Sequence, residues 1–206
     1  MAPTPHRLAN ADLAADPVEQ FARWFADAEA HPDIVFAEAV CLSTLGPNET
    51  PEGRMVLLKH FDGRGFVFYT NLESGKGRSL AGHPRAGMTF YWQPLDRQVR
   101  IRGAVEPVSR EEADAYFATR PKGSQLGAWA SDQSRDLKTR AALEARLRAV
   151  EERFTGGGVP RPPHWSGYRI IADAIEFWQE GGSRLHDRFV YERDAAGVWT
   201  RRRLYP

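Results

Sequence analysis

The sequence of 206 residues predicts a mainly β protein with added helices, folded as an antiparallel barrel. Short apolar or alternating runs, separated by Gly, Pro and Asn, dominate residues 39–108 and return after residue 168. Helical patterns lie between these runs without a regular βαβ alternation, which favours a barrel over a doubly wound parallel sheet. The length suits a single all-β domain.

The first element is a helix expected over residues 17–30. Asp16 followed by Pro17 is a good N-cap and first helical residue. The apolar residues that follow have the spacing of one helix face: Phe21, Trp24, Phe25 and Ala28. We expect residues 1–15 to form a flexible N-terminal segment and residues 16–206 to form a single domain.

Strands of one antiparallel sheet come next, over residues 39–45, 54–61, 65–70, 87–92 and 97–108. A short loop, Asp62-Gly63-Arg64, joins the second of them to the third as a hairpin. In the last strand Gln98, Arg100 and Arg102 alternate with apolar positions. Polar side chains of that strand therefore share one face.

Two helices and three more strands complete the chain. Ser109 and Glu112 form a capping box for a helix over residues 110–119. Apolar residues at helical spacing predict a second helix over residues 136–154, which the glycines at 156–158 end. The Gly/Pro-rich residues 156–165 are expected to be a linker within the domain. The final strands are expected over residues 168–178, 188–193 and 198–204.

Composition argues against several classes of partner. Lys and Arg number 28 against 27 Asp and Glu, so the net charge of +1 provides no bulk attraction for nucleic acid or an anionic membrane. No apolar run reaches the roughly 20 residues of a membrane span. The single cysteine, Cys41, excludes an internal disulfide, and no secretory signal is recognisable, so a cytoplasmic protein is expected.

Several segments could bind an anion locally. Ser74, Gly75 and Lys76 lie where a strand ends and a short helix could begin, so backbone N–H groups, a hydroxyl and an ammonium could meet a phosphate. The residues alone leave an ordinary solvated turn open, since such turns often carry Gly and Lys. The Rossmann and P-loop fingerprints are both absent.

Further candidate binding residues can also be explained by a purely structural role. Arg54 and Lys59 would lie on opposite faces of one strand unless it bulges or ends between them. Tyr116 and Arg120 would share one side of a helix, with Ser124 beyond the break at Pro121, a set that suits a phosphate ester or simply a surface helix end. Gln133 and Ser134 offer neutral hydrogen-bonding groups or a helix N-terminus.

The segment EFWQEGGSRLHDR, residues 176–188, is the most specific. If it is extended, Arg184, His186 and Arg188 project from one face and need an anionic or aromatic acceptor. His186 has no partner at metal-ligand spacing, so no metal site is expected.

This segment resembles the C-terminal signature of the pyridoxamine 5′-phosphate oxidase family, E-[FY]-W-Q-x4-R-L-H-[DN]-R. Further blocks resemble the family in the right order, so the resemblance covers about residues 16–206: RMVLLKHFD, FVFYTNLESGK, RQVRIRG, YFATRPKGSQLGAWASDQS and RLYP. The resemblance implies an antiparallel FMN-binding split β-barrel that forms a homodimer, with the flavin at the subunit interface.

The resemblance also implies roles for individual residues. Flavin mononucleotide (FMN) would be held by Arg54, Met55, Val56, Leu57, Leu58, Lys59, Tyr69, Thr70, Gly75, Lys76, Gln98, Gln133, Ser134, Trp178 and Arg188. The substrate phosphate would meet Lys59, Tyr116, Arg120 and Ser124, and its ring would lie beside the catalytic pair Arg184 and His186. Such an enzyme oxidises pyridoxamine or pyridoxine 5′-phosphate to pyridoxal 5′-phosphate, passing hydride to the flavin, which O2 reoxidises with release of H2O2.

The chain departs from the family pattern in two places. Gly75 stands where many relatives have Arg or Lys, and the Arg-rich stretch that can cover the substrate is missing before Asp16, where Arg7 could partly substitute. Two other functions stay open. One is a split-barrel flavin oxidase acting on another substrate, such as a phenazine precursor, and the other is a non-catalytic flavin or pyridoxal-phosphate binding protein.

Overall fold

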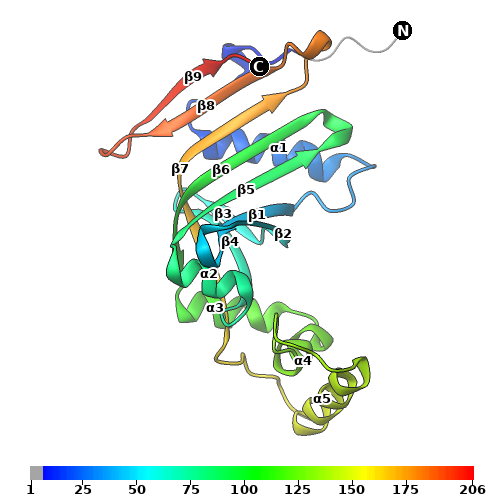
Figure 1. Cartoon of the computed structure of the whole chain (residues 1–206). Coiled ribbons are helices and arrows are strands. Elements are labelled where there is room, and N and C mark those ends of the chain that lie inside the picture. The colour runs from blue at the N-terminus through cyan, green and yellow to red at the C-terminus, as the bar shows by residue number, and fades with distance from the viewer. Residues whose placement is uncertain (1–6) are drawn as a thin grey trace.

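A computed structural model of the chain describes residues 7–206. Within them, one sheet of nine antiparallel strands curls around a hydrophobic core, and helices gather mainly at one end (Figure 1). The strands are β1 Ala39–Leu45, β2 Pro51–Leu57, β3 His60–Asp62, β4 Gly65–Asn71, β5 Arg85–Trp92, β6 Arg97–Pro107, β7 Trp165–Gln179, β8 Asp187–Arg193 and β9 Trp199–Leu204. The helices are α1 Pro17–Ala30, α2 Gly75–Gly82, α3 Arg110–Thr119, α4 Lys122–Ala130 and α5 Arg140–Arg153, with short 3-10 turns η1 Asn10–Asp12, η2 Pro47–Glu49, η3 Gln93–Leu95 and η4 Gly182–Arg184.

The long strand β7 organises the sheet, whose order is β2-β1-β5-β6-β7-β4-β3, with β8 and β9 added beside β7. One edge of β7 pairs with β6, while the other edge pairs first with β4 and then with β8. The register of β6 on β7 shifts between Arg102 and Gly103, where a Cβ on Gly103 would lie 1.9 Å from the carbonyl oxygen of Ile171. This close backbone approach needs glycine, and it marks the position where β7 changes its second partner.

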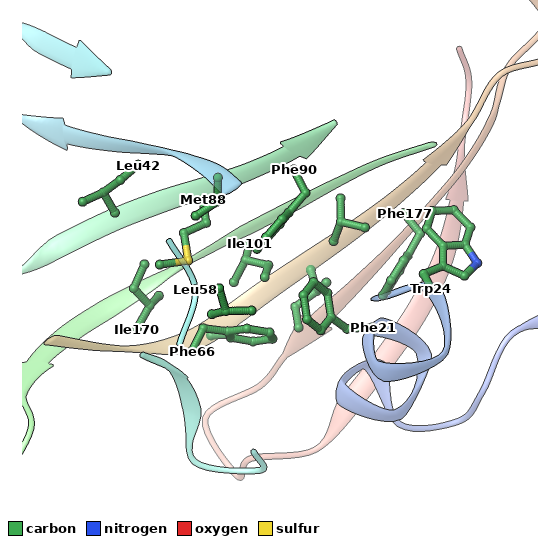
Figure 2. Close-up of a cluster of buried hydrophobic side chains, with 14 of the residues drawn as sticks. Phe21, Trp24, Leu42, Leu58, Phe66, Met88, Phe90, Ile101, Ile170 and Phe177 are labelled. Carbon is green, nitrogen blue, oxygen red and sulfur yellow. The ribbon is translucent and has the colours of Figure 1, made fainter. Parts of the chain in front are cut away.

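Helix α1 closes the barrel with its apolar face. The Asp16 carboxylate caps it by accepting from the N–H groups of Val18 and Glu19. Phe21 and Trp24 then enter the core, where the ring of Trp24 meets that of Phe177 edge-on at 5.2 Å (Figure 2). Burying several aromatic side chains of this size contributes about 1.5–3 kcal/mol each, which is enough to hold the helix on the sheet.

Most predicted elements are confirmed, because their signals were local. The N-cap at Asp16 and the capping box of Ser109 and Glu112 both form, and α1 and α3 have the predicted bounds. The predicted hairpin between β3 and β4 also forms. None of the helices in the described part of the chain is long and apolar enough to cross a membrane.

Two predicted elements were too long and one was missing. The strand expected over residues 54–61 ends at Leu57, because the next two residues change partners: the N–H of Leu58 donates to Glu38, and that of Lys59 to Val67. The helix expected from residue 136 begins only at Arg140. Helix α4 was not predicted, since Pro121 was interpreted only as a break, whereas it is also the residue from which the next helix starts.

The N-terminal segment differs from expectation. Residues 1–15 were predicted to be flexible, yet Leu8, Leu13 and Ala14 are buried. The N–H of Leu8 donates to Asp187, and the hydroxyl of Tyr191 donates to the carbonyl of Ala14. Apolar side chains and backbone hydrogen bonds thus fix this segment to β8. The part of the prediction that concerns residues 1–6 lies outside the described residues.

Candidate active site

A cavity of about 440 Å³ opens where β2, β4, α3 and α4 meet. Eleven of the residues predicted for cofactor or substrate line it: Met55, Val56, Leu57, Lys59, Tyr69, Thr70, Lys76, Tyr116, Arg120, Ser124 and Gln133. Thr119, Pro121 and Trp165 complete the wall. None of these described lining residues is acidic, so Lys59, Lys76 and Arg120 make the cavity positive within a nearly neutral protein.

The ends of secondary-structure elements position the charged groups. Lys59 follows the break between β2 and β3, and its ammonium lies 3.7 Å from the carboxylate of Glu38. Tyr116 and Arg120 lie one helical turn apart at the end of α3, as predicted. Ser124 lies in the first turn of α4. Because Pro121 turns the chain between the two helices, all three side chains border the same cavity.

Aromatic rings form one wall of the cavity. The ring of Tyr69 stacks on that of Tyr116, with centroids 4.0 Å apart, and on that of Trp165 at 5.3 Å. The guanidinium carbon of Arg120 lies 4.7 Å from the centroid of the Trp165 ring. Burial raises the pKa of both Tyr69 and Tyr116, so their phenols stay protonated and can donate hydrogen bonds at neutral pH.

Arg120 has an unused hydrogen-bonding atom. Its Nη1 is buried, and no other group among the described residues accepts from it. Burial lowers the pKa of this guanidinium, and a buried charged donor without an acceptor costs several kcal/mol. An anionic oxygen in the cavity would remove that cost, which makes Arg120 the clearest anion-binding group of the site.

Lys76 forms a second polar cluster. Its ammonium lies 3.3 Å from the hydroxyl of Thr70 and 3.4 Å from the amide oxygen of Gln133. Burial and, to a lesser extent, the positive charge of Arg54 lower the pKa of Lys76. The negative charge of a phosphate beside Lys76 would favour the charged ammonium and so offset both effects, which makes the cluster suitable for an anion.

The structure differs in part from what was expected of the turn before Lys76. The hydroxyl of Ser74 is buried, donates to the carbonyl of Asn71 and accepts from the N–H of Gly77, so it caps α2 instead of facing a ligand. Gly75 lies beside Ser134, because a Cβ on Gly75 would be 3.7 Å from the Ser134 hydroxyl. These two predicted cofactor residues therefore border the Lys76 cluster without lining the cavity.

Two further predicted cofactor residues lie outside the cavity wall. The guanidinium of Arg54 donates to Thr44 at 2.6 Å and pairs with Glu52 at 2.6 Å. Leu58 is only 4% exposed and belongs to the hydrophobic core. Arg54 is thus held by β1 and β2, and Leu58 belongs to the core, so neither side chain lines the cavity.

The remaining predicted cofactor residues form a separate row. Gln98, Trp178 and Arg188 lie directly opposite one another on β6, β7 and β8. Arg188 is held by the carboxylate of Glu176 at 2.8 Å and donates to the carbonyl of Tyr205. The row shares no residue with the cavity wall. Trp165 and Trp178 lie near opposite ends of β7, roughly 40 Å apart along an extended strand.

The predicted catalytic pair lies beside this row, but its expected geometry was wrong. Residues 182–184 form the turn η4, and Arg184 has a positive φ of 64°, so Arg184 and His186 do not share a strand face. The ring of His186 packs on that of Trp178 with centroids 4.6 Å apart. Its Nδ1 accepts from the N–H of Gly181, while the Arg184 side chain is exposed. His186 thus packs on Trp178, and neither His186 nor Arg184 lines the cavity.

Two family models match the chain. A model described as pyridoxamine 5′-phosphate oxidase matches residues 26–154, and one described as the pyridoxine 5′-phosphate oxidase C-terminal dimerisation region matches residues 165–206. The chain belongs to the pyridoxamine 5′-phosphate oxidase family. This confirms the predicted family and the prediction of an enzyme, an oxidoreductase.

Relatives within this family are similar over nearly their whole length. A pyridoxine/pyridoxamine 5′-phosphate oxidase of Burkholderia ambifaria is 55% identical over 97% of this chain and 93% of the relative. One of Myxococcus xanthus is 52% identical over 98% of this chain and 97% of the relative. Among solved structures, PhzG from Burkholderia lata 383, in complex with tetrahydrophenazine-1-carboxylic acid, has a TM-score of 0.88 at 30% identity over 98% of this chain and 100% of that chain.

A pyridoxamine 5′-phosphate oxidase-related, FMN binding protein from Nostoc punctiforme has a TM-score of 0.75 over 94% of this chain and 100% of that one. At 17% identity it is evidence for the fold alone. The two structural neighbours confirm the predicted split-barrel fold class of the family.

Two residues of the site were missed by sequence reasoning. Trp165 was assigned to a linker, although it begins β7 and stacks on Tyr69. Glu176, which fixes Arg188, was treated only as the first letter of a signature. Glu176 lies two residues before Trp178, the register partner of Arg188, so it is a diagonal neighbour of Arg188 across β7 and β8, and that relation could have suggested the ion pair. No group of potential metal ligands occurs within residues 7–206.

Proposed function

We propose that this protein is an FMN-dependent oxidase that converts pyridoxamine 5′-phosphate and pyridoxine 5′-phosphate to pyridoxal 5′-phosphate. O2 is the electron acceptor and is reduced to H2O2, and with the amine substrate water hydrolyses the resulting imine and ammonia is released. The observation that carries the proposal is the buried Nη1 of Arg120, which has no partner within residues 7–206 and lies in a positive cavity that a phenol and a hydroxyl also line. Two relatives that are more than 50% identical to this chain are named pyridoxine/pyridoxamine 5′-phosphate oxidase, and this supports the choice of substrate.

The substrate phosphate belongs at the α3–α4 end of the cavity. Arg120, Tyr116 and Ser124 can donate to its oxygens, and Lys59 contributes a charge that Glu38 only partly neutralises at 3.7 Å. The wall of Tyr69, Tyr116 and Trp165 excludes water from one side, which strengthens these interactions.

The cofactor phosphate belongs at the other polar cluster, where Lys76, Thr70 and Gln133 converge and no acidic group among the described residues lines the wall. These donors fit a phosphate monoester. The bound flavin would supply the two-electron chemistry by accepting hydride from the substrate and passing the electrons to O2. The chain itself binds and orients both molecules.

We propose that the site is completed in a homodimer. Gln98, Trp178 and Arg188, with Arg184 and His186, would reach the cavity of a second copy of the chain, since they cannot reach their own along β7. Exposed apolar side chains beside the cavity support a covering subunit: Met55 is 64% exposed and Leu57 41%. The match of residues 165–206 to a dimerisation region agrees with this arrangement.

Oxidation of a phenazine precursor is the alternative that the similarity to PhzG favours. The ligand named in that structure is a carboxylic acid, whereas this cavity is lined by four groups that can donate to an anion: Lys59, Tyr116, Arg120 and Ser124. That number of donors suits a phosphate better than a carboxylate. Peroxide release on adding pyridoxine 5′-phosphate tests the choice: turnover supports the proposal, and turnover only of a phenazine precursor contradicts it.

The purified protein should be yellow and contain FMN rather than FAD. The Lys76 cluster meets a terminal phosphate dianion, which FAD lacks because its phosphate continues into a diphosphate. Extraction of the flavin followed by chromatography against both standards measures this. FAD as the sole extracted flavin would contradict the assignment of Lys76.

Arg184→Lys should lower kcat/KM by one to two orders of magnitude with bound flavin unchanged. A guanidinium is planar and can stack on the substrate ring while donating to its substituents, whereas an ammonium cannot, so about 1.4–3 kcal/mol of positioning is lost. Steady-state kinetics and flavin content are measured on the same preparation. Wild-type kinetics would remove Arg184 from the site, and loss of flavin would reassign it to the cofactor.

A further inference from the structure

A buried arginine on β7 connects three elements near the cavity. Arg169 is only 3% exposed, and its guanidinium lies 2.6 Å from Glu112 on α3, 3.4 Å from Asp62 on the β3–β4 hairpin and 3.7 Å from Glu106 on β6. Desolvating such a group costs several kcal/mol, so buried ion pairs of this kind are weak sources of stability. They can instead fix one orientation of the elements that they join.

Glu112 is the carboxylate that links this network to the site. One of its oxygens accepts from the N–H of Ser109 at 3.1 Å, and the other pairs with Arg169. The hydrogen bond from Ser109 and the charge of Arg169 both hold the pKa of Glu112 below its usual value, so the residue is ionised at neutral pH. Its backbone carbonyl accepts from the Tyr69 hydroxyl at 3.5 Å. The first turn of α3 is therefore tied to β7 and to β4.

The contacts of Glu112 at the start of α3 affect the residues later in the same helix. Tyr116 lies one turn after Glu112, and Arg120 one turn later at the end of the helix. Ala113 and Phe117 are the buried residues of this 10-residue helix. Apolar contacts of two side chains fix the face of the helix more firmly than its position along its axis. An ion pair at the first turn fixes that position.

We propose that Glu112 and Arg169 are positioning residues for the substrate phosphate. Their ion pair sets the position of α3, and with it the distance between Tyr116, Arg120 and the phosphate. This inference rests on the proposed function of the cavity. It predicts that breaking the pair weakens phosphate recognition while the chemistry at the other end of the substrate continues.

The test is Glu112→Gln, whose amide oxygen can still accept from Ser109 but which lacks the charge that faces Arg169. We expect KM for pyridoxine 5′-phosphate to rise about tenfold with kcat within about twofold of wild type. The preference for phosphorylated over unphosphorylated pyridoxine should fall by the same factor, with flavin content unchanged. Two controls separate this effect from stability. Glu106→Gln removes another carboxylate from Arg169 without touching α3, and Ser109→Ala removes the cap but keeps the ion pair.

Both controls should keep the wild-type KM, even where the melting temperature falls. An unchanged KM in Glu112→Gln, or an equal rise in Glu106→Gln, would overturn the inference. So would a loss of kcat and flavin together, which indicates a general structural role. Should wild type fail to oxidise pyridoxine 5′-phosphate, the proposed function fails. Titration of wild type and the same variants with inorganic phosphate then tests the inference. Phosphate should bind more weakly to Glu112→Gln and as in wild type to the two control variants.

Discussion

Replacing Arg120 by alanine should lower kcat/KM for pyridoxine 5′-phosphate by about 10²–10³-fold. In the proposed site the guanidinium would make charge-assisted hydrogen bonds to the phosphate, each contributing about 1.5–3 kcal/mol, because its buried Nη1 has no acceptor among the described residues. Flavin content should be unchanged, because the Lys76 cluster lies at the other end of the cavity. Steady-state kinetics with both substrates and the extracted flavin measure these effects.

The matched control is Arg110→Ala in the same helix. Its side chain is 83% exposed and pairs with Asp114, so its loss should leave kinetics near wild type. Unphosphorylated pyridoxine gives a second control. For wild type, its kcat/KM should be lower than that of pyridoxine 5′-phosphate by a factor that corresponds to at least about 4 kcal/mol of transition-state stabilisation. Arg120→Ala should lower the kcat/KM for unphosphorylated pyridoxine little further. Equal losses of Arg120→Ala on both substrates would show that Arg120 does not bind the phosphate.

Variants damaged in different parts of the site should restore each other in a mixed dimer. Lys76→Ala removes a cavity residue, and Arg188→Ala removes a residue of the row on β6, β7 and β8. Each alone should lose activity by on the order of tenfold or more. If every site takes Lys76 from one chain and Arg188 from the other, a heterodimer contains one intact site and recovers about half of the wild-type activity.

Co-expression with two affinity tags isolates this heterodimer, and light scattering checks its mass. The control pair is Lys76→Ala with Arg120→Ala, since both residues line the cavity of the same chain and neither site of that heterodimer is intact. Recovery in the control, or its absence in the test pair, contradicts a site shared between subunits. A fully active monomer contradicts the homodimer itself.

The sequence was a good guide wherever a signal was local. The caps at Asp16 and Ser109 marked helix starts through side-chain hydrogen bonds to nearby N–H groups. The helical spacing of Tyr116 and Arg120 correctly placed both on one side of α3. Such features depend on residues within one or two turns, so no tertiary information was needed.

Other features depend on residues far apart in the chain and could not be predicted. The guanidinium of Arg54 reaches the hydroxyl of Thr44 only because β2 pairs with β1. Arg184 lies in a turn of positive φ that an alternating pattern does not reveal. The division of the predicted flavin residues between the cavity and a distant row also needs the sheet, because both groups look equivalent in a linear motif.

The pairing of β7 on both edges also affects how the chain unfolds. It has hydrogen-bonded neighbours on both edges along most of its length, and the side chains of Ile170, Ile175 and Phe177 are fully buried. Opening it breaks two ladders at once, so it separates only when the whole sheet unfolds. Trp165 at one end borders the cavity, and Trp178 near the other belongs to the distant row. Within one chain both regions therefore depend on the same strand, and an unfolding event that opens β7 removes both of them together.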